Sequence, residues 1–243
     1  ATTVADGAIF ERFPQLLERF LRFLRIHPEL QENIAPLHLP GAPFVTNRPA
    51  LPAFLVLVLL APLSALAHEG SSLPYGSFVA GLAHPVLGVD HFLAMVSVGI
   101  VSAQIGGRAI WTVPGTFVTV MALGGVLGWL NVGLASIEVG IAFSVLVLGI
   151  AIAADRKMPI LVAMGAVAIF ATFHGYAHGA EMPTVANPVK YALGFMTGTA
   201  LLHIVGVLIG DISQHYARGK VLLRVAGAAI AGAGTWFLVG LAG

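Results

Sequence analysis

The chain has 243 residues, of which 58% are hydrophobic and 9% are charged. Soluble domains carry roughly 25% charged residues, so this composition excludes a soluble globule and indicates an integral membrane protein. The net charge of +1 gives no basic field for nucleic acid, and the absence of cysteine excludes disulfides, thiolate metal sites and thiol catalysis.

Residues 1–48 form an N-terminal extension that is richer in charge than the rest of the chain. Apolar residues recur at helical spacing between Phe13 and Leu24, which predicts a short amphipathic helix, and a proline-rich linker follows it. The extension could be an interfacial helix or a contact for a partner protein. We favour the simpler interpretation, in which it is translated upstream sequence or otherwise dispensable.

Residues 49–67 have the features of a secretory signal peptide. Arg48 supplies a positive flank, an apolar run follows, and a small-x-small cleavage site ends at Ala67. The stretch that begins at Leu51 also has roughly the 17 residues of the shortest spanning helices, so an uncleaved crossing is the alternative. We expect cleavage after Ala67, which makes His68 the first residue of the mature protein.

Residues 68–243 are predicted to form a permease domain, an all-α bundle of about six transmembrane helices. Six apolar segments each come near the ~20 residues that cross a bilayer. They run approximately over 77–104, 110–130, 133–154, 159–178, 188–210 and 220–241. Basic residues follow the first, third and fifth segments, whereas Lys190 alone lies on the other side. The positive-inside rule therefore places both mature termini on the periplasmic side of a bacterial inner membrane.

Small residues at four-residue spacing predict that these helices pack closely against one another. The pairs are Gly124/Gly128, Gly194/Gly198, Gly206/Gly210 and Ala228/Gly232.

Ionisable groups interrupt the first segment, although each costs roughly 2.5–3.5 kcal/mol on insertion scales. In "HPVLGVDHFLAM", His84 and His91 are two helical turns apart and share one face, and Asp90 precedes His91. Pro85 cannot donate a hydrogen bond to the Gly81 carbonyl, so we expect the helix to start late or to kink there. A lone buried histidine is more often structural. Two imidazoles and a carboxylate together suit a divalent first-row metal.

Polar residues also occur in three later segments. In "FHGYAHGAEMP", His174 and His178 form an i, i+4 pair that could reach one ion, and Glu181 shares the face of His174 if the helix continues. The alternative is a polar helix end at the membrane interface. Glu138 in the third segment and His203 in the fifth are single residues, for which interhelical hydrogen bonding is the alternative to metal binding.

Four stretches together resemble the successive signatures of the HupE/UreJ family of membrane proteins, which are associated with hydrogenase and urease maturation and regarded as nickel permeases. They are "HPVLGVDHFLAM", "IEVGIAFSVLVLG", "FHGYAHGAEMP" and "GTALLHIVGVLIG". The resemblance covers approximately residues 64–243 and includes His68, whereas residues 1–48 depart from it. It implies that the metal ligands fall on His84, Asp90, His91, Glu138, His174, His178, Glu181 and His203.

The expected function is import of Ni²⁺, with no organic cofactor and no catalytic reaction. The resemblance implies nickel, whereas the spacing alone indicates only a divalent metal that favours nitrogen and oxygen ligands, Co²⁺ and Zn²⁺ included. The expected partners are the ion, the lipid bilayer and nickel-enzyme maturation proteins. No Walker motif occurs, so ATP is not expected to be the direct energy source. The membrane potential could drive the cation inward, and proton coupling is the alternative.

At ~1.5 Å per helical residue, the candidate ligands would lie at several depths. His68 and Glu181 would meet the ion first. His68 could chelate it through its imidazole and its new α-amine, although an ordinary exposed terminus is equally consistent. Asp90 and His91 would lie deeper, with His203 at comparable or greater depth. An intramembrane zinc hydrolase is the alternative function, and a haem-binding bundle is a third.

Overall fold

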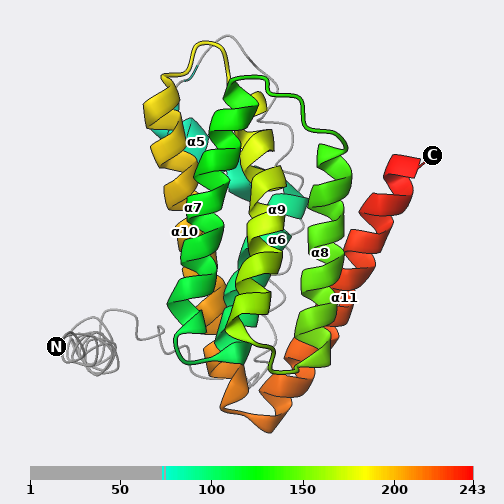
Figure 1. Ribbon diagram of the computed structural model, residues 1–243. Coiled ribbons are helices and arrows are strands. Elements are labelled where there is room, and N and C mark those ends of the chain that lie inside the picture. The colour runs from blue at the N-terminus through cyan, green and yellow to red at the C-terminus, as the bar shows by residue number, and fades with distance from the viewer. Residues whose placement is uncertain (1–72, 74, 243) are drawn as a thin grey trace, which may run out of the picture. The chain divides into compact units, whose positions relative to one another are not determined.

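The computed structural model describes residues 73 and 75–242, and all regular structure within these residues is helical. Its helices are α5 (Gly76–Leu87), α6 (Val89–Ile105), α7 (Ala109–Trp129), α8 (Ile137–Ala154), α9 (Ile160–Ala180), α10 (Pro188–Gln214) and α11 (Ala217–Ala242), as Figure 1 shows. Five are long and apolar enough to cross a membrane, and α5 with α6 makes a bent sixth. The predicted all-α membrane bundle is confirmed. The N-terminal extension, the signal peptide and His68 lie outside the described residues.

The predicted first segment is two helices that meet at an angle of 82°. We expected Pro85 to start or kink the helix, but α5 runs through Pro85 and ends at Leu87. The chain turns instead at Gly88, whose backbone is extended with φ −82° and ψ 115°. This break, three residues after the proline, allows α5 and α6 to leave Gly88 in different directions. The expectation of one helix that carries His84 and His91 on a single face is therefore wrong.

Glycines set the distance between α7 and α9. A Cβ atom added to Gly128 of α7 would lie 2.1 Å from the carbonyl oxygen of Tyr176, and one added to Gly179 of α9 would lie 2.0 Å from that of Gly125. The two helices therefore touch backbone to backbone, as small residues permit in membranes. Figure 1 shows α7 and α9 running side by side.

The other small-residue pairs predicted from the sequence differ in how closely they approach a neighbouring helix. Gly194 packs on α5 and Gly206 on α6, where an added Cβ would in each case meet a carbonyl oxygen at 2.1 Å. Gly232, in contrast, has no atom within 4 Å of such a Cβ. The neighbouring Gly234 makes the close contact with α8 instead, where an added Cβ would lie 2.3 Å from the backbone nitrogen of Leu146.

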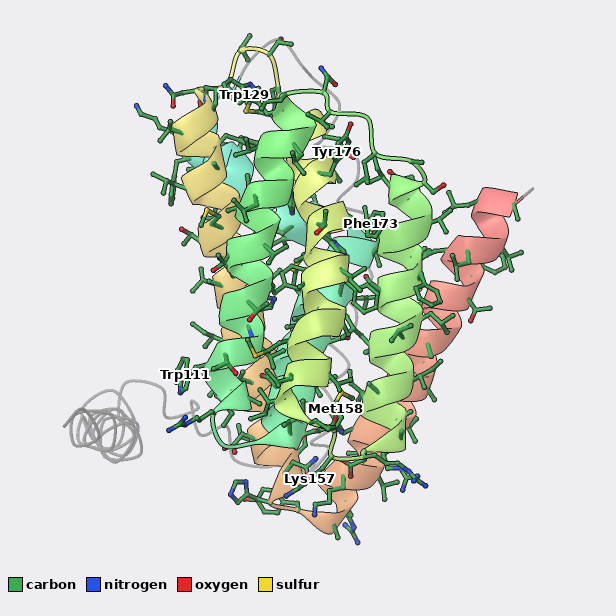
Figure 2. All side chains as sticks on the ribbon, viewed as in Figure 1. Trp111, Trp129, Lys157, Met158, Phe173 and Tyr176 are labelled. Carbon is green, nitrogen blue, oxygen red and sulfur yellow. The ribbon has the colours of Figure 1, made fainter. Side chains whose placement is uncertain are left out.

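One end of the bundle, called here the basic end, carries most of the basic residues that the structure describes. They are Arg108, Arg156, Lys157, Arg218, Lys220 and Arg224, at or near the junctions α6–α7, α8–α9 and α10–α11. Figure 2 shows Lys157 at this end and Trp129 at the opposite end. At the basic end, Asp155 accepts hydrogen bonds from the side-chain amides of Gln104 at 3.0 Å and Gln214 at 3.1 Å. These bonds join α6, the end of α8 and α10.

Candidate metal centre

Four histidines from three helices form a cluster of imidazole rings, called here the histidine cluster: His84 of α5, His91 of α6, and His174 and His178 of α9. The ring centre of His91 lies 4.7 Å from that of His174, 4.9 Å from that of His178 and 6.2 Å from that of His84. The ring centre of His84 lies 4.8 Å from that of His178. On a straight helix, His84 and His91 would be roughly 10.5 Å apart along the axis, so the break at Gly88 brings them closer.

Several nitrogens of the histidine cluster are buried without a hydrogen-bond partner. His174 and His178 are 0% exposed and His91 is 7% exposed. The unpartnered atoms are Nε2 of His91, Nδ1 of His174, and both ring nitrogens of His178. Buried polar atoms in folded proteins nearly always have a partner, so these nitrogens fit a ligand that would supply one. A divalent cation is such a ligand for imidazole.

The cluster is not a closed coordination shell. Within residues 75–242, no three His, Asp or Glu side chains converge on a single point at ligand distances. Binding of one ion by three of them therefore requires side-chain rotation.

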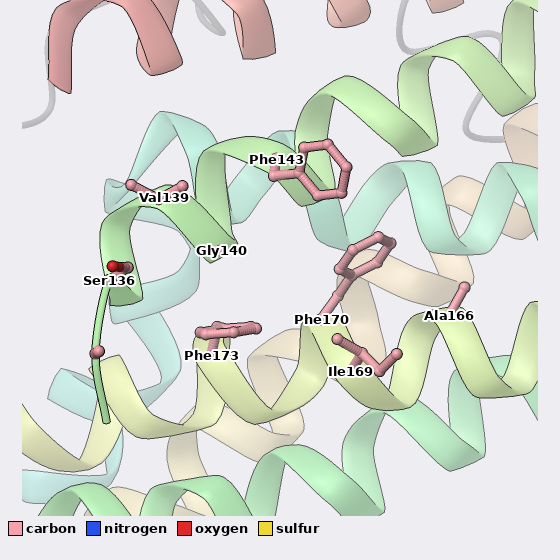
Figure 3. A pocket seen from close by; sticks show the side chains of 9 residues that line it. Ser136, Val139, Gly140, Phe143, Ala166, Ile169, Phe170 and Phe173 are labelled. Atoms are coloured by element: carbon pink, nitrogen blue, oxygen red, sulfur yellow. The ribbon is translucent and has the colours of Figure 1, made fainter. Parts of the chain in front are cut away.

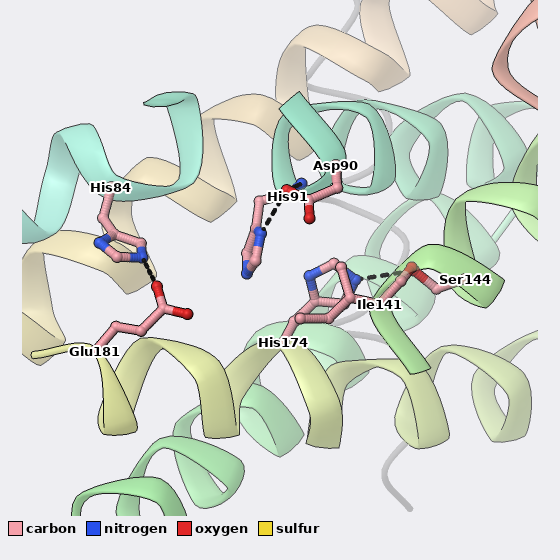
Figure 4. A network of polar contacts seen from close by, with 7 residues as sticks. All are labelled: His84, Asp90, His91, Ile141, Ser144, His174 and Glu181. Carbon is pink, nitrogen blue, oxygen red and sulfur yellow. Dashed lines mark hydrogen bonds and ion pairs between the residues drawn. The ribbon is translucent and has the colours of Figure 1, made fainter. Parts of the chain in front are cut away.

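Asp90 determines which nitrogen His91 presents. One carboxylate oxygen of Asp90 lies 2.9 Å from Nδ1 of His91 and also accepts the backbone N–H of His91 at 2.7 Å. A carboxylate accepts, so Nδ1 of His91 carries the proton and Nε2 keeps a free lone pair. Figure 4 shows the ring of His91 between His84 and His174, with Asp90 beside it. Asp90 can thus attract a cation and orient a ligand at the same time.

His84 has both ring nitrogens engaged. The hydroxyl of Tyr191 lies 2.8 Å from Nδ1, and a carboxylate oxygen of Glu181 lies 3.2 Å from Nε2. The hydrogen bond from His84 lowers the pKa of the Glu181 carboxyl, which lies just beyond the last residue of α9. The His84–Glu181 contact, drawn in Figure 4, ties α5 to the end of α9. An ion that binds His84 must displace one of these two partners.

Three contacts of the cluster were not foreseen from the sequence. Tyr191 holds His84, Ser144 of α8 lies 2.9 Å from Nε2 of His174, and Phe195 of α10 stacks on His178 with ring centres 4.8 Å apart. The only sequence feature that could have indicated Ser144 is that it is a hydroxyl residue within an otherwise apolar helix. The two aromatic residues carried no signal, because their role depends on where α10 packs.

His203 lies apart from the histidine cluster. The ring of Phe117 is 5.7 Å from that of His174 and 5.2 Å from that of His203, so it lies beside both. His203 is 2% exposed, and both its ring nitrogens lack a partner. His91 lies next to both His174 and His178, with ring centres 4.7 Å and 4.9 Å away. His203 forms a separate position on α10.

Asp90 and Glu138 line a pocket of about 260 Å³ together with residues of α11. The remaining lining residues are Ala142, Trp236, Phe237, Gly240 and Leu241. Because Asp90 also contacts His91, this pocket places two carboxyl groups next to the cluster. Glu138 is thus near Asp90 rather than bonded to a histidine of the cluster.

A second pocket, of about 380 Å³, lies between α8 and α9. Figure 3 shows Phe143, Phe170 and Phe173 around it, and its lining is otherwise small or aliphatic except for Ser136. Such a lining suits a lipid chain and offers a metal ion no nitrogen or carboxylate ligand.

Comparison with known proteins agrees with the motifs around these histidines. Residues 55–237 match the family described as HupE / UreJ protein. The chain belongs to the HupE/UreJ family. It is 44% identical over 178 residues to protein HupE of Rhizobium leguminosarum bv. viciae, a match that covers 73% of this chain and 93% of that protein. No solved structure matches the chain. The resemblance inferred from four sequence stretches is confirmed, and with it the assignment to a hydrogenase and urease accessory family.

Proposed function

We propose that this HupE/UreJ protein is a permease that imports Ni²⁺ across the inner membrane to supply hydrogenase or urease maturation. The observation that carries the proposal is the histidine cluster, in which four buried ring nitrogens have no partner. Imidazole nitrogen suits nickel, and also cobalt and zinc, so metal selectivity depends on geometry and availability. Maturation proteins that receive nickel would be the partners on the cytoplasmic side.

The ligands differ in their proposed tasks. His91, His174 and His178 offer unpaired nitrogens and would contact the partly dehydrated ion directly. His84 and Glu181, which already contact each other, would exchange that contact for the ion at the outer side. These five residues would form the main site.

Further groups would handle the ion before and after the main site. Asp90 and Glu138 would attract it electrostatically from the pocket that they line. His203 would receive it beyond Phe117. His68, outside the described residues, would meet it first if the signal peptide is removed.

The orientation follows from charge. The basic end would face the cytoplasm, because short cytoplasmic loops carry an excess of Lys and Arg. The end with Glu181 and Lys190 would then face the periplasm, as would both mature termini. A negative interior favours entry, since ~100 mV contributes roughly 4.6 kcal/mol for a doubly charged ion.

Burial favours a transporter over the zinc hydrolase that the residues alone also allow. His174 and His178 are 0% exposed, so a hydrolytic substrate could not reach them without movement of the helices. A hydrolytic zinc site must keep an open position for water and substrate.

The test is uptake of radioactive nickel into proteoliposomes that contain the purified protein, with zinc and cobalt as competitors. His178→Ala removes an imidazole whose two nitrogens bond to nothing, so it breaks no hydrogen bond while it removes a ligand. The expected result is loss of uptake at unchanged protein level. His215→Ala is the matched control, because His215 is exposed and its side chain bonds to the backbone carbonyl of Asp211, four residues earlier in α10. Equal nickel uptake by empty vesicles and by the wild-type protein would refute the proposal.

A further inference from the structure

Ser144 is a fully buried hydroxyl on α8 that contacts two groups at once. Its Oγ lies 2.7 Å from the carbonyl oxygen of Ile141 and 2.9 Å from Nε2 of His174. A serine hydroxyl has one proton to donate, and a carbonyl oxygen can only accept. Ser144 therefore donates its hydrogen bond to the Ile141 carbonyl, and its oxygen is placed to accept a hydrogen bond from the Nε2–H of His174. Figure 4 shows Ser144 on one side of the His174 ring and His91 on the other.

This arrangement favours one tautomer of His174. A neutral imidazole carries one N–H, and here that N–H is at Nε2, so Nδ1 keeps a free lone pair. Nδ1 is buried and has no partner. The other tautomer would place a proton on Nδ1, where no acceptor lies, and would face the bare Nε2 toward the oxygen of Ser144. The contact with Ser144 favours the tautomer that leaves Nδ1 open.

We propose that Ser144 is a positioning residue of the metal site, which holds His174 so that Nδ1 faces the ion. The proposal rests on the proposed function, because it takes His174 as a ligand of the transported ion. Asp90 does the same for His91 with the opposite nitrogen, since it accepts a hydrogen bond from Nδ1–H and leaves Nε2 open. Each of these two ligands thus has its own acceptor, as metal-binding histidines in proteins usually do.

The first experiment measures the tautomer in the metal-free, full-length protein. Solid-state ¹⁵N NMR of histidine-labelled protein in lipid bilayers distinguishes a protonated from a bare ring nitrogen, and the His174→Gln spectrum assigns the signal. The wild type is expected to show His174 with Nε2 protonated. Ser144→Ala removes the acceptor and is expected to shift the population toward the other tautomer. Ser144→Thr keeps a hydroxyl and is expected to restore the wild-type spectrum.

Ser102→Ala is the matched control. Ser102 is equally buried and makes the same 2.7 Å bond to the carbonyl three residues before it, that of Gly99. It lies about three turns along α6 from His91, so its loss reproduces the structural part of the change without touching an imidazole of the cluster. An unchanged His174 signal in this variant, with a changed one in Ser144→Ala, supports the proposal. If His174 has the same tautomer in the wild type and in Ser144→Ala, the proposal is overturned.

The second experiment measures metal binding and uptake. In Ser144→Ala, the apparent KM for nickel uptake is expected to rise about tenfold, the lower end of what loss of such a partner costs in metal affinity. The visible spectrum of bound Co²⁺ is expected to change as well, and Ser144→Thr should restore both. An unaltered KM and cobalt spectrum in Ser144→Ala would refute the positioning role. Failure of the wild type to take up nickel would instead refute the proposed function, while the NMR result would still decide the tautomer.

Discussion

Gly179 offers a direct test of how the histidine cluster is positioned. In Gly179→Ala the new Cβ would lie 2.0 Å from the carbonyl oxygen of Gly125, whereas ordinary contacts begin at 3.4 Å, so α7 and α9 must separate locally by about 1.4 Å, the difference between the two distances. Overpacking of this kind costs about 1–3 kcal/mol. At roughly 2–4 °C per kcal/mol for a chain of this size, the melting temperature should fall by about 2–12 °C.

The same displacement should move His178, which precedes Gly179, relative to His91 and so reduce nickel uptake. Thermal unfolding in detergent and proteoliposome uptake measure the two effects. Gly165→Ala is the control on the same helix, because a Cβ there meets no atom within 4 Å. If Gly179→Ala matches Gly165→Ala in both melting temperature and nickel uptake, the contact between α7 and α9 does not position the histidines.

Three further predictions concern charge and processing. Asp90→Asn keeps the size of the side chain but removes its charge, so nickel uptake should fall at least tenfold while the protein remains monodisperse in detergent. His91→Ala should abolish uptake. Nickel uptake at the parental rate in both variants, when both are well folded, would contradict the assignment of this metal site. The mature chain should begin at His68, as intact mass of the membrane-extracted protein would reveal; a retained signal segment would argue for a further crossing. Deletion of residues 2–44 behind a new start codon should leave uptake unchanged, and lost uptake at equal protein level would reveal a role for the predicted amphipathic helix.

Hydropathy and motif spacing predicted the helices and most of the polar cluster. The six segments were found because each needs about 20 apolar residues, and the bounds differ from the helices by only a few residues. The histidines were found because ionisable groups are rare in such segments. Both features depend only on nearby residues in the chain, so a single sequence reveals them.

Other features depend on tertiary packing and were missed. Pro85 suggested a kink, but the chain breaks at Gly88, where the backbone is extended and α5 packs against α10. The glycine there leaves space for Asp90, because an added Cβ would lie 3.0 Å from its Oδ1. Ser144 and Tyr191 act through helices that the sequence cannot place next to the cluster. In "FHGYAHG", the sequence predicted the histidines as ligands, whereas it did not indicate that the glycines beside them form the contact that brings α9 against α7.

The break between α5 and α6 also shapes the electric field around the cluster. Peptide dipoles give the amino end of a helix about half a positive charge and the carboxyl end about half a negative one. The ion would therefore meet an attractive end at α5, near His84, and a repulsive end at α6, near His91. Asp90 lies in the first turn of α6, where its carboxylate offsets that repulsion. Without this charge, His91 would still have a nitrogen to offer, but at a position where the local potential disfavours a cation.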